Sequence, residues 1–312
     1  MPPTDLAIII LNYNTRDLLR RCLETVYASQ GNFSYAVCVV DNASSDGSAA
    51  MVRADYAQAA LIASPINGGY PYGNNLGLRH FGWSDRPGAG DAAATPRYAL
   101  LLNPDTELPP AGLAEMLAFM DERPQCGVAG PKLVRLDGSL DLACRRSFPT
   151  PQVSLYRMAG LSKLFPRSPR FGRYNMTFVD PDRTIEVDSV VGAYMQVRGA
   201  AIHQVGLLDE TFFMYGEDLD WAYRIKQRGW QVWYNPSVTV LHVKEAASKS
   251  SSKARYEFYR AMLIFYRKHY QATTPLLLHW AIVGGIGLRG ALDLASRRWS
   301  QWLHSRRTAP QA

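Results

Sequence analysis

Three groups of polar residues in this chain have types and positions suited to chemistry. They are Asn103-Pro104-Asp105, Glu217-Asp218-Leu219-Asp220 and His242. The first follows an apolar run, the second opens a helical pattern, and the third ends an apolar run. A carboxylate at the mouth of a crevice can act as a general base. Carboxylate, amide and imidazole groups together can bind a divalent cation such as Mg²⁺ or Mn²⁺.

Each group also has a purely structural explanation, which the sequence leaves open. Asp105 can be a turn aspartate that follows a strand. Acidic residues in a first helical turn complement the helix dipole, and Asp220 is spaced to pair with Arg224. A lone histidine such as His242 is most often a hydrogen-bonded structural residue. The surrounding elements must decide between these explanations.

The first third of the chain alternates between apolar runs and helical patterns. We predict strands at 6–11, 36–40, 61–63 and 98–102, and helices at 17–28, 48–56 and 72–81. This alternation predicts an α/β fold with a parallel sheet and right-handed crossovers. Polar residues follow each predicted strand: Asn12, Asn14, Asp41, Asn42, Asn67, Asn103 and Asp105. Because ligands of open α/β sheets bind at the carboxyl ends of strands, these residues predict a binding crevice.

The following part of the chain is more varied. We predict helices at 110–120 and 217–228, and strands at 127–130, 185–197, 230–234 and 237–241. Residues 137–183 are expected to be irregular and basic, and to form a segment that is either mobile or turned toward an acceptor substrate. Gly192, inside a predicted strand, indicates close approach of a ligand to the backbone.

Composition narrows the class of protein. The chain has 312 residues, 47% hydrophobic and 20% charged, with a net charge of +7. This is typical of a folded globular protein. The four cysteines lack CxxC spacing, which favours reduced core thiols and a cytoplasmic location. No secretory signal pattern opens the chain. P-loop, GxGxxG and GxSxG motifs are absent, and no nucleic-acid-binding module is recognisable, so nucleic acid is not an expected partner.

The last part of the chain combines basic, aromatic and apolar residues. We predict a helix at 255–270, and an apolar stretch at 276–288 that is shorter than the ~20 residues of a spanning helix. Basic residues and two tryptophans follow, a composition typical of an interfacial segment on an anionic membrane. A core helix or a subunit interface, and with it an oligomer, remains an alternative. A Ser/Lys/Ala-rich loop at 244–253 precedes this part.

Five motifs in order resemble the family 2 glycosyltransferases of GT-A fold, and among them bacterial rhamnosyltransferases. The motifs are IIILNYNTRDLLRRCLET, VVDNASSDGS, NGGYPYGNNLG, LLNPDTEL and FFMYGEDLDWAYRIKQRGW with a following VTVLH. The resemblance implies a Rossmann-like mixed sheet with a C-terminal helical extension. It divides the chain into a catalytic domain at 1–245, with a nucleotide-sugar half at 1–107 and an acceptor half at 108–245, then helices at 246–305 and a flexible tail at 306–312.

The resemblance also implies roles for individual residues. Tyr13 and Asp41 would contact the base and ribose of a nucleotide-diphospho-sugar. The same donor would be lined by further residues: Asn67, Gly69, Asn75, Asn103 and Asp105. Asp105 and His242 would bind a divalent cation, and Asp218 would be the catalytic base. The acceptor would touch Glu217, Trp221 and Gly192. Asn103 stands where many members of the family have aspartate.

The activity implied is inverting transfer of L-rhamnose from dTDP-rhamnose to a glycan or a polyprenyl-diphosphate-linked acceptor for the cell wall or a polysaccharide. The expected place is the cytoplasmic face of the inner membrane, as a peripheral protein. A UDP-sugar donor, for example of galactofuranose, is an alternative. A catalytically silent GT-A module that assembles with partners is another.

Overall fold

The computed structural model describes residues 4–243 and 252–307, with side chains as far as Ala295. The chain divides into two compact units, Met1–Phe213 with Glu217–Lys244, and Met214–Gly216 with Glu245–Ala312. The predicted loop at 244–253 and the predicted tail at 306–312 lie largely outside the described residues. Each unit is described by itself below.

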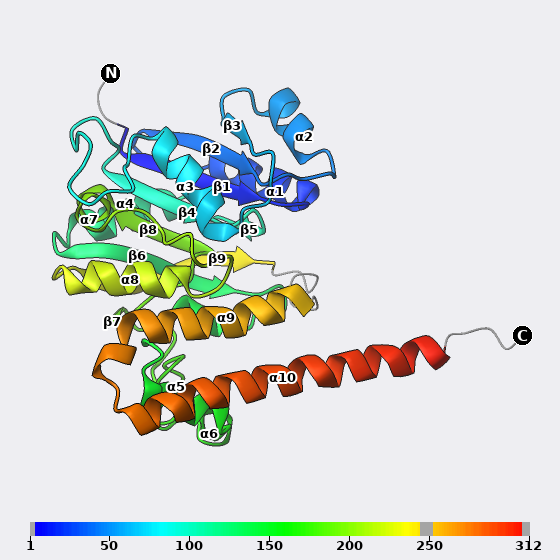
Figure 1. Ribbon diagram of the computed structural model, residues 1–312. Helices are drawn as coiled ribbons and strands as arrows, with labels where there is room; N and C mark the ends of the chain where they lie inside the picture. The colour runs from blue at the N-terminus through cyan, green and yellow to red at the C-terminus, as the bar shows by residue number, and fades with distance from the viewer. Residues whose placement is uncertain (1–3, 244–251, 308–312) are drawn as a thin grey trace, which may run out of the picture. The chain divides into compact units, whose positions relative to one another are not determined.

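The first unit begins with parallel strands connected by helices, as the sequence predicts (Figure 1). Its strands and helices are β1 Leu6–Asn12, α1 Arg16–Tyr27, β2 Tyr35–Asp41, α2 Ser48–Asp55, β3 Ala60–Ala63, α3 Tyr70–His80 and β4 Tyr98–Leu102. Strand β1 pairs in parallel with both β2 and β4, and β2 pairs in parallel with β3. Their carboxyl ends therefore meet at one edge.

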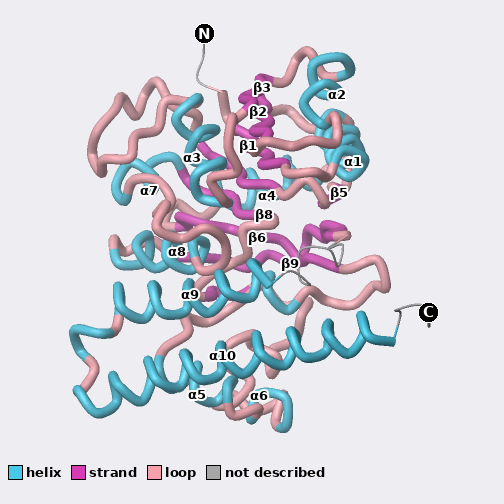
Figure 2. Tube along the Cα trace, turned by 45° about the vertical axis from the view of Figure 1, so that its right-hand side comes forward, coloured by secondary structure: helices cyan, strands magenta, loops and turns pink. Residues whose placement is uncertain are grey.

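Burial explains why these runs become strands and helices. All five residues of β4 are buried, which is typical of a strand covered on both faces. Helix α1 buries Leu18, Leu19, Cys22, Leu23 and Val26, which lie on one face at helical spacing. Figure 2 views the sheet nearly edge-on, with α1 and α2 on one side and α3 on the other. The four cysteines are buried and unpaired.

The second half of this unit turns the sheet into a mixed one. Its elements are β5 Thr106–Glu107, α4 Gly112–Asp121, β6 Cys126–Val134, β7 Ile185–Val187, β8 Tyr194–Arg198, α7 Gly199–Val205, α8 Glu217–Gln227 and β9 Gln231–His242. The described residues form a nine-stranded sheet in the order β3-β2-β1-β4-β8-β6-β9-β5, with β7 beside β9. Strand β8 runs antiparallel to β4. This agrees with the predicted mixed sheet.

Three predicted elements differ from the structure. The strand predicted at 185–197 is two strands, because β7 pairs with β9 whereas β8 pairs with β4 and β6. The strands predicted at 230–234 and 237–241 are one strand, β9. Its ladder with β6 skips from Asn235 to Thr239, so Pro236 falls where no ladder hydrogen bond is needed.

The segment predicted to be irregular at 137–183 contains short helices. They are η1 Leu142–Cys144, α5 Pro151–Met158 and α6 Leu161–Leu164. Thr150 caps α5 by accepting a hydrogen bond from the Val153 amide, and Pro151 occupies the first turn. A threonine cap followed by proline is a recognisable helix start.

The second unit contains two long helices, α9 Ser252–His269 and α10 Leu276–Arg307, joined by the short η3 Gln271–Thr273. Arg255 pairs with Asp293, and the Tyr266 hydroxyl lies 3.0 Å from Nδ1 of His279. Gly290 lets the Tyr259 ring approach to within contact distance. These contacts hold the two helices side by side.

Helix α10 is longer than the apolar stretch that predicted it. By length and composition, Leu276–Ala295 meets the minimum for a membrane-spanning helix, and 11% of that window is buried. The stretch at 276–288 was expected to be too short for this, because it was counted without the flanking helical residues. The same window includes Arg289 and Asp293, which are charged residues.

Candidate active site

The carboxyl ends of β1 and β2 are fastened together by polar side chains. Asn12 is fully buried, and its Nδ2 donates to Asp41 Oδ1 at 3.0 Å and to Ser44 Oγ at 3.1 Å. Asp41 Oδ2 accepts the Ser44 amide. Tyr13, which directly follows β1, is 50% exposed. These hydrogen bonds fix the ends of β1 and β2 to each other, and the Tyr13 ring next to them in the chain is accessible to a ligand.

The loop before α3 is shaped by Asn42. Its Nδ2 donates to Asn67 Oδ1 at 2.9 Å and to the Gly69 carbonyl at 3.2 Å, and its Oδ1 accepts the Gly68 amide. Gly69 has a φ of +92°, and a Cβ there would lie 2.3 Å from the Phe213 carbonyl oxygen. A glycine is therefore required for both conformation and space. Asn67 and Gly69 are held in the loop that follows β3.

Asn75 differs from its expected role. It is fully buried, and its amide donates to the Leu208 carbonyl at 2.9 Å and to Glu210 at 2.8 Å. Its Oδ1 accepts the Leu208 amide. In this structure Asn75 joins α3 to the segment before α8, and it presents no amide atom to a donor.

Asn103 and Asp105 form a turn at the end of β4. The backbone N–H of Asn103 donates to the Ala193 carbonyl, and the backbone carbonyl of Asn103 accepts the Thr106 hydroxyl. Asp105 Oδ1 lies 3.4 Å from Nε2 of His242, and the Asp105 side chain is 18% exposed. The pairing of β5 with β9 places Thr106 opposite His242. A strand ladder therefore brings together two residues far apart in the sequence.

His242 is held from its other side by Asp141, a residue that the sequence interpretation missed. Nδ1 of His242 donates to Asp141 Oδ2 at 3.0 Å, and both residues are buried. Burial alone would lower the pKa of His242, but the hydrogen bonds with Asp105 and Asp141 outweigh it and raise that pKa. A histidine whose Nδ1 is fixed by a carboxylate directs Nε2 outward, as in many metal sites.

Asp218 lies in a buried ion pair. Its Oδ2 accepts from Arg146 Nη2 at 2.6 Å and from the Gly192 amide at 3.1 Å, while Oδ1 accepts the Leu219 amide. The side chains of Arg146 and Asp218 are 9% and 7% exposed. Burial alone would lower the pKa of Arg146, but Asp218 raises it well above its ordinary value. Arg146 therefore supplies the counter-charge to this buried carboxylate.

Glu217, the neighbouring carboxylate, has a different environment. Its Oε2 is buried and has no hydrogen-bond partner among the described residues. Burial and, second, the charge of Asp218 raise the pKa of Glu217 to about 8. At neutral pH Glu217 is therefore mainly protonated. Two adjacent carboxyl groups in different surroundings suit two different roles, because Asp218 pairs with Arg146 whereas Glu217 Oε2 has no partner among the described residues.

Tyr70, the first residue of α3, contacts the backbone just before β8. Its hydroxyl donates to the Gly192 carbonyl at 2.7 Å, and a Cβ on Gly192 would lie 2.6 Å from that hydroxyl oxygen. The predicted close approach to Gly192 is thus made by Tyr70. The pKa of Tyr70 lies well above its ordinary value. Burial is the largest cause, and the charges of Glu217, Asp218 and Asp105 raise this pKa further. Carboxyl groups from two parts of the chain, the turn after β4 and the start of α8, therefore act on one hydroxyl.

The remaining residues of α8 are structural. Trp221 is fully buried and donates its indole N–H to the Gly206 carbonyl at 2.9 Å, so it has no exposed surface for an acceptor. This departs from the expectation. Asp220 accepts from Arg224 Nε at 2.9 Å, which confirms the predicted helical pair.

Three residues that the sequence interpretation did not assign therefore complete the site: Tyr70, Asp141 and Arg146. Arg146 lies in the basic segment at 137–183, for which no individual residue was assigned. Tyr70 lies in the NGGYPYGNNLG motif, of which only Asn67, Gly69 and Asn75 were assigned. Asp141 has no local signal, because only the pairing of distant strands brings it to His242.

Substitution of Glu217 tests its protonation. A raised pKa means that the folded state holds a proton that the unfolded chain releases above its ordinary pKa near 4.5. Stability of the wild type therefore falls as the pH rises from about 4.5 to about 8. We expect Glu217→Gln to gain in Tm relative to wild type across this window, with a constant difference above it. Thermal denaturation from pH 4.5 to 9.5 measures this, and a pH-independent difference would contradict it.

The mixed sheet, with polar side chains gathered at the carboxyl ends of its first strands, is typical of the GT-A class of glycosyltransferases. Residues 2–259 match the family described as glycosyltransferase like family 2, and the chain belongs to that family. The chain is therefore a transferase.

Individual relatives agree with this. The chain is 26% identical over 294 residues to N-acetylglucosaminyl-diphospho-decaprenol L-rhamnosyltransferase of Mycobacterium tuberculosis, covering 93% of each chain. It is 25% identical to rhamnosyltransferase WbbL of Escherichia coli, covering 78% of this chain and 85% of that one. In fold it is similar to the mannosyltransferase PcManGT from Pyrobaculum calidifontis, solved with GDP-Man and Mn²⁺. That likeness has a TM-score of 0.55 at 14% identity and covers 99% of this chain and 77% of that one.

Proposed function

We propose that this chain is an inverting, metal-dependent rhamnosyltransferase that moves L-rhamnose from dTDP-rhamnose to a glycolipid acceptor of cell-wall or polysaccharide synthesis. The observation that carries the proposal is the set of contacts that joins the Asp105 turn to Asp218: the Asn103 backbone amide donates to the Ala193 carbonyl, and the adjacent Gly192 amide donates to Asp218 Oδ2. It brings a carboxylate suited to the leaving diphosphate into the same site as one suited to the attacking hydroxyl.

Asp218 is the residue to which we assign the base. The acceptor hydroxyl gives its proton to the Asp218 carboxylate, and its oxygen forms a bond to the anomeric carbon. The bond from that carbon to the phosphate oxygen breaks, and dTDP leaves with the electron pair. Glu217, neutral at pH 7, is suited to donate a hydrogen bond to the acceptor or to orient Asp218.

The donor would lie along the strand ends, with Tyr13 stacking on the base and Asp41, Asn67 and Gly69 lining the pocket. Asp105 and His242 fit a divalent cation, because His242 is fixed by Asp141 in the way that metal-binding histidines are held. The described residues contain no cluster of three His, Cys, Asp or Glu side chains able to hold an ion. Diphosphate oxygens would therefore complete the coordination. A divalent cation there stabilises the negative charge of the departing diphosphate.

Thermal-shift measurements test the donor. We expect dTDP-rhamnose with Mg²⁺ or Mn²⁺ to raise the Tm, because a ligand bound only by the folded state stabilises it. UDP- and GDP-sugars are the controls. A response to a UDP-sugar alone would assign a different donor, and no response to any of them would overturn the proposal.

Asp141→Asn tests the metal site apart from catalysis. A carboxylate that holds a metal-binding histidine through its other ring nitrogen typically contributes about 10–100-fold to metal affinity. We expect Mn²⁺ affinity in the presence of dTDP to fall by about tenfold or more, measured by electron paramagnetic resonance. Asp182→Asn, an exposed acidic residue, is the control. Unchanged affinity in Asp141→Asn would remove His242 from the proposed ligands.

We also infer that α10 contacts an anionic membrane from the cytoplasmic side. The helix exposes large apolar side chains, namely Leu276, Leu277, Trp280, Leu288 and Leu292. Such a face near basic residues is typical of interfacial helices. Sedimentation with vesicles tests it: binding to vesicles with anionic lipid but not to neutral ones is expected, and no binding to either contradicts it.

A further inference from the structure

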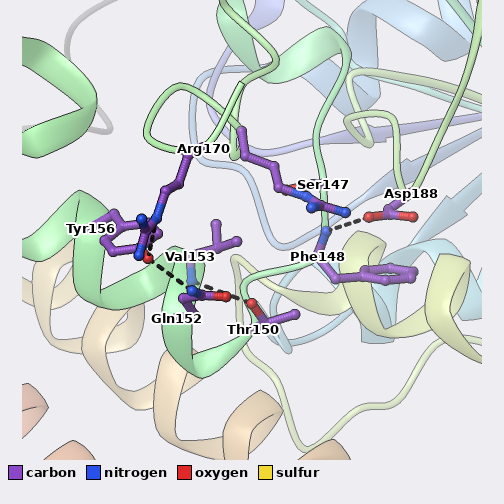
Figure 3. Close-up of a pocket in the computed structure, with 9 residues that line it drawn as sticks. Ser147, Phe148, Thr150, Gln152, Val153, Tyr156, Arg170 and Asp188 are labelled. Carbon is purple, nitrogen blue, oxygen red and sulfur yellow. Dashed lines mark hydrogen bonds between the residues drawn. The ribbon is translucent and has the colours of Figure 1, made fainter. Parts of the chain in front are cut away.

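A polar pocket lies outside the donor crevice, between the first turn of α5, the 170–173 segment and the loop after β7. It encloses about 210 Å³. Figure 3 shows Arg170 and Tyr156 on one side of it and Phe148 and Asp188 on the other. This volume is below the ~300–1,000 Å³ of pockets for drug-sized ligands. It is large enough for a small, strongly hydrated group.

The pocket is positively charged. From Leu142 to Val179 the chain has seven arginine and lysine residues and no aspartate or glutamate. Two of them, Arg170 and Arg173, line the pocket. Arg170 Nε donates to the Tyr156 hydroxyl at 2.8 Å, which orients the guanidinium. In the described part of the chain its Nη atoms, and the whole Arg173 guanidinium, make no hydrogen bond or ion pair.

Asp188, the carboxylate that lines the pocket, does not cancel this charge. Its Oδ2 accepts the Phe148 amide at 3.0 Å, and its Oδ1 lies 3.5 Å from Nζ of Lys226. Lys226, which also pairs with Glu186 at 2.8 Å, offsets part of the negative charge of Asp188, and the single carboxylate faces two arginines. The two arginines remain available for an anion, and guanidinium groups match phosphate oxygens in geometry.

Two further features favour an anion. Ser147 lines the pocket, is 5% exposed, and has a buried hydroxyl without a hydrogen-bond partner among the described residues. A buried polar group of this kind calls for a ligand or water. The first turn of α5 also lines the pocket with Thr150, Gln152 and Val153, and a helix N-terminus favours negative charge.

We propose that this pocket binds the phosphate or diphosphate group of the acceptor, an inference that rests on the proposed transferase function. The donor diphosphate has its own place near Asp105 and His242. The pocket instead adjoins the base: Ser147 follows Arg146, whose guanidinium pairs with Asp218, and the Phe148 ring packs edge-on against Tyr223 of α8. A charged group anchored here holds the acceptor sugar beside the residue that deprotonates it.

Binding of inorganic pyrophosphate tests the pocket without any transfer reaction. Titration calorimetry with EDTA present removes any contribution from a divalent cation. We expect saturable binding that weakens at least about tenfold in Arg170→Gln/Arg173→Gln. Arg167→Gln, in the same basic segment but outside the pocket, is the matched control and is expected to bind like wild type.

Three results would contradict the proposal that this pocket binds the phosphate of the acceptor. They are displacement of pyrophosphate by dTDP, equal weakening in Arg167→Gln, and binding to anionic vesicles without binding to soluble pyrophosphate. The first would place the anion in the donor site. The second would mean that pyrophosphate binds through the net positive charge of the segment and not through the pocket. The third would mean that the segment binds a lipid surface. Circular dichroism of each variant verifies that it is folded.

Transfer kinetics identify the source of the phosphate. With a prenyl-diphosphate-linked sugar, we expect the double variant to raise the acceptor KM at least about tenfold. With the octyl glycoside of the same sugar, and for the donor, KM should stay within about twofold of wild type. Pyrophosphate binding with an unchanged acceptor KM would make this a site for free phosphate and overturn the acceptor assignment. No transfer by the wild type would reject the proposed function, while the calorimetric result would still report on the pocket.

Discussion

Asp218→Asn should lower the rate of sugar transfer by about 10²–10⁴-fold while donor binding is retained. The amide has the shape of the carboxylate, and its oxygen can still accept from Arg146 and from the Gly192 amide. It cannot accept a proton from the acceptor hydroxyl. The rate is measured as release of dTDP with acceptor present, and donor binding as the thermal shift with dTDP-rhamnose.

The control for this substitution is Asp17→Asn. Asp17 also lies in the first turn of a helix, but its side chain is 81% exposed and pairs with its neighbour Arg16. It should leave transfer unchanged. If Asp218→Asn abolished donor binding, the base would be misassigned. If it left transfer intact while Glu217→Gln abolished it, the base would be Glu217.

Arg146→Met should lower the free energy of unfolding by about 3–5 kcal/mol, because it leaves the Asp218 carboxylate buried without a counter-charge. Methionine keeps much of the length and apolar volume of arginine. The loss is therefore mainly electrostatic. Urea denaturation at pH 7 measures it, and transfer should be lost in the same variant because Asp218 is no longer held.

A double-mutant cycle separates the pair from its surroundings. Removing both charges in Arg146→Met/Asp218→Asn should cost less than the sum of the two single substitutions. Lys226→Met is the matched control, because Lys226 pairs with the more exposed Glu186 and should cost within about 1 kcal/mol. If Arg146→Met and Lys226→Met lowered the free energy of unfolding equally, the buried pair would contribute no more to stability than the exposed one.

The donor half of the fold was predictable because its signals are local. Each of its strands is a short apolar run, and each is followed by polar residues that the parallel arrangement brings to one edge. The helical spacing of Leu18, Leu19, Cys22, Leu23 and Val26 predicted the buried face of α1. Family motifs then identified Asp105, Asp218 and His242 as the residues to consider.

What could not be predicted depends on contacts between distant residues. Asp141 reaches His242 across 101 positions, and Arg146 reaches Asp218 across 72. Neither pairing has a sequence period. Trp221 illustrates the opposite error: an aromatic residue beside two carboxylates suggests an acceptor contact, but its place on α8 faces the core. The long strand β9 was divided in the prediction because Pro236 resembles a strand end.

Strands β6 and β7 both pair with β9, so the segment between them leaves the sheet and returns to the same strand. It leaves the sheet after Val134, which lies opposite Leu241, and returns at Ile185, which lies opposite Tyr234. Residues 135–184 can therefore change in length without altering the order of the strands, as long as Asp141 and Arg146 keep their contacts with His242 and Asp218. This segment also carries most of the pocket proposed for phosphate. Under the proposed function, we expect exchange of the pocket residues between relatives, with Asp141 and Arg146 kept, to change the acceptor and not the donor.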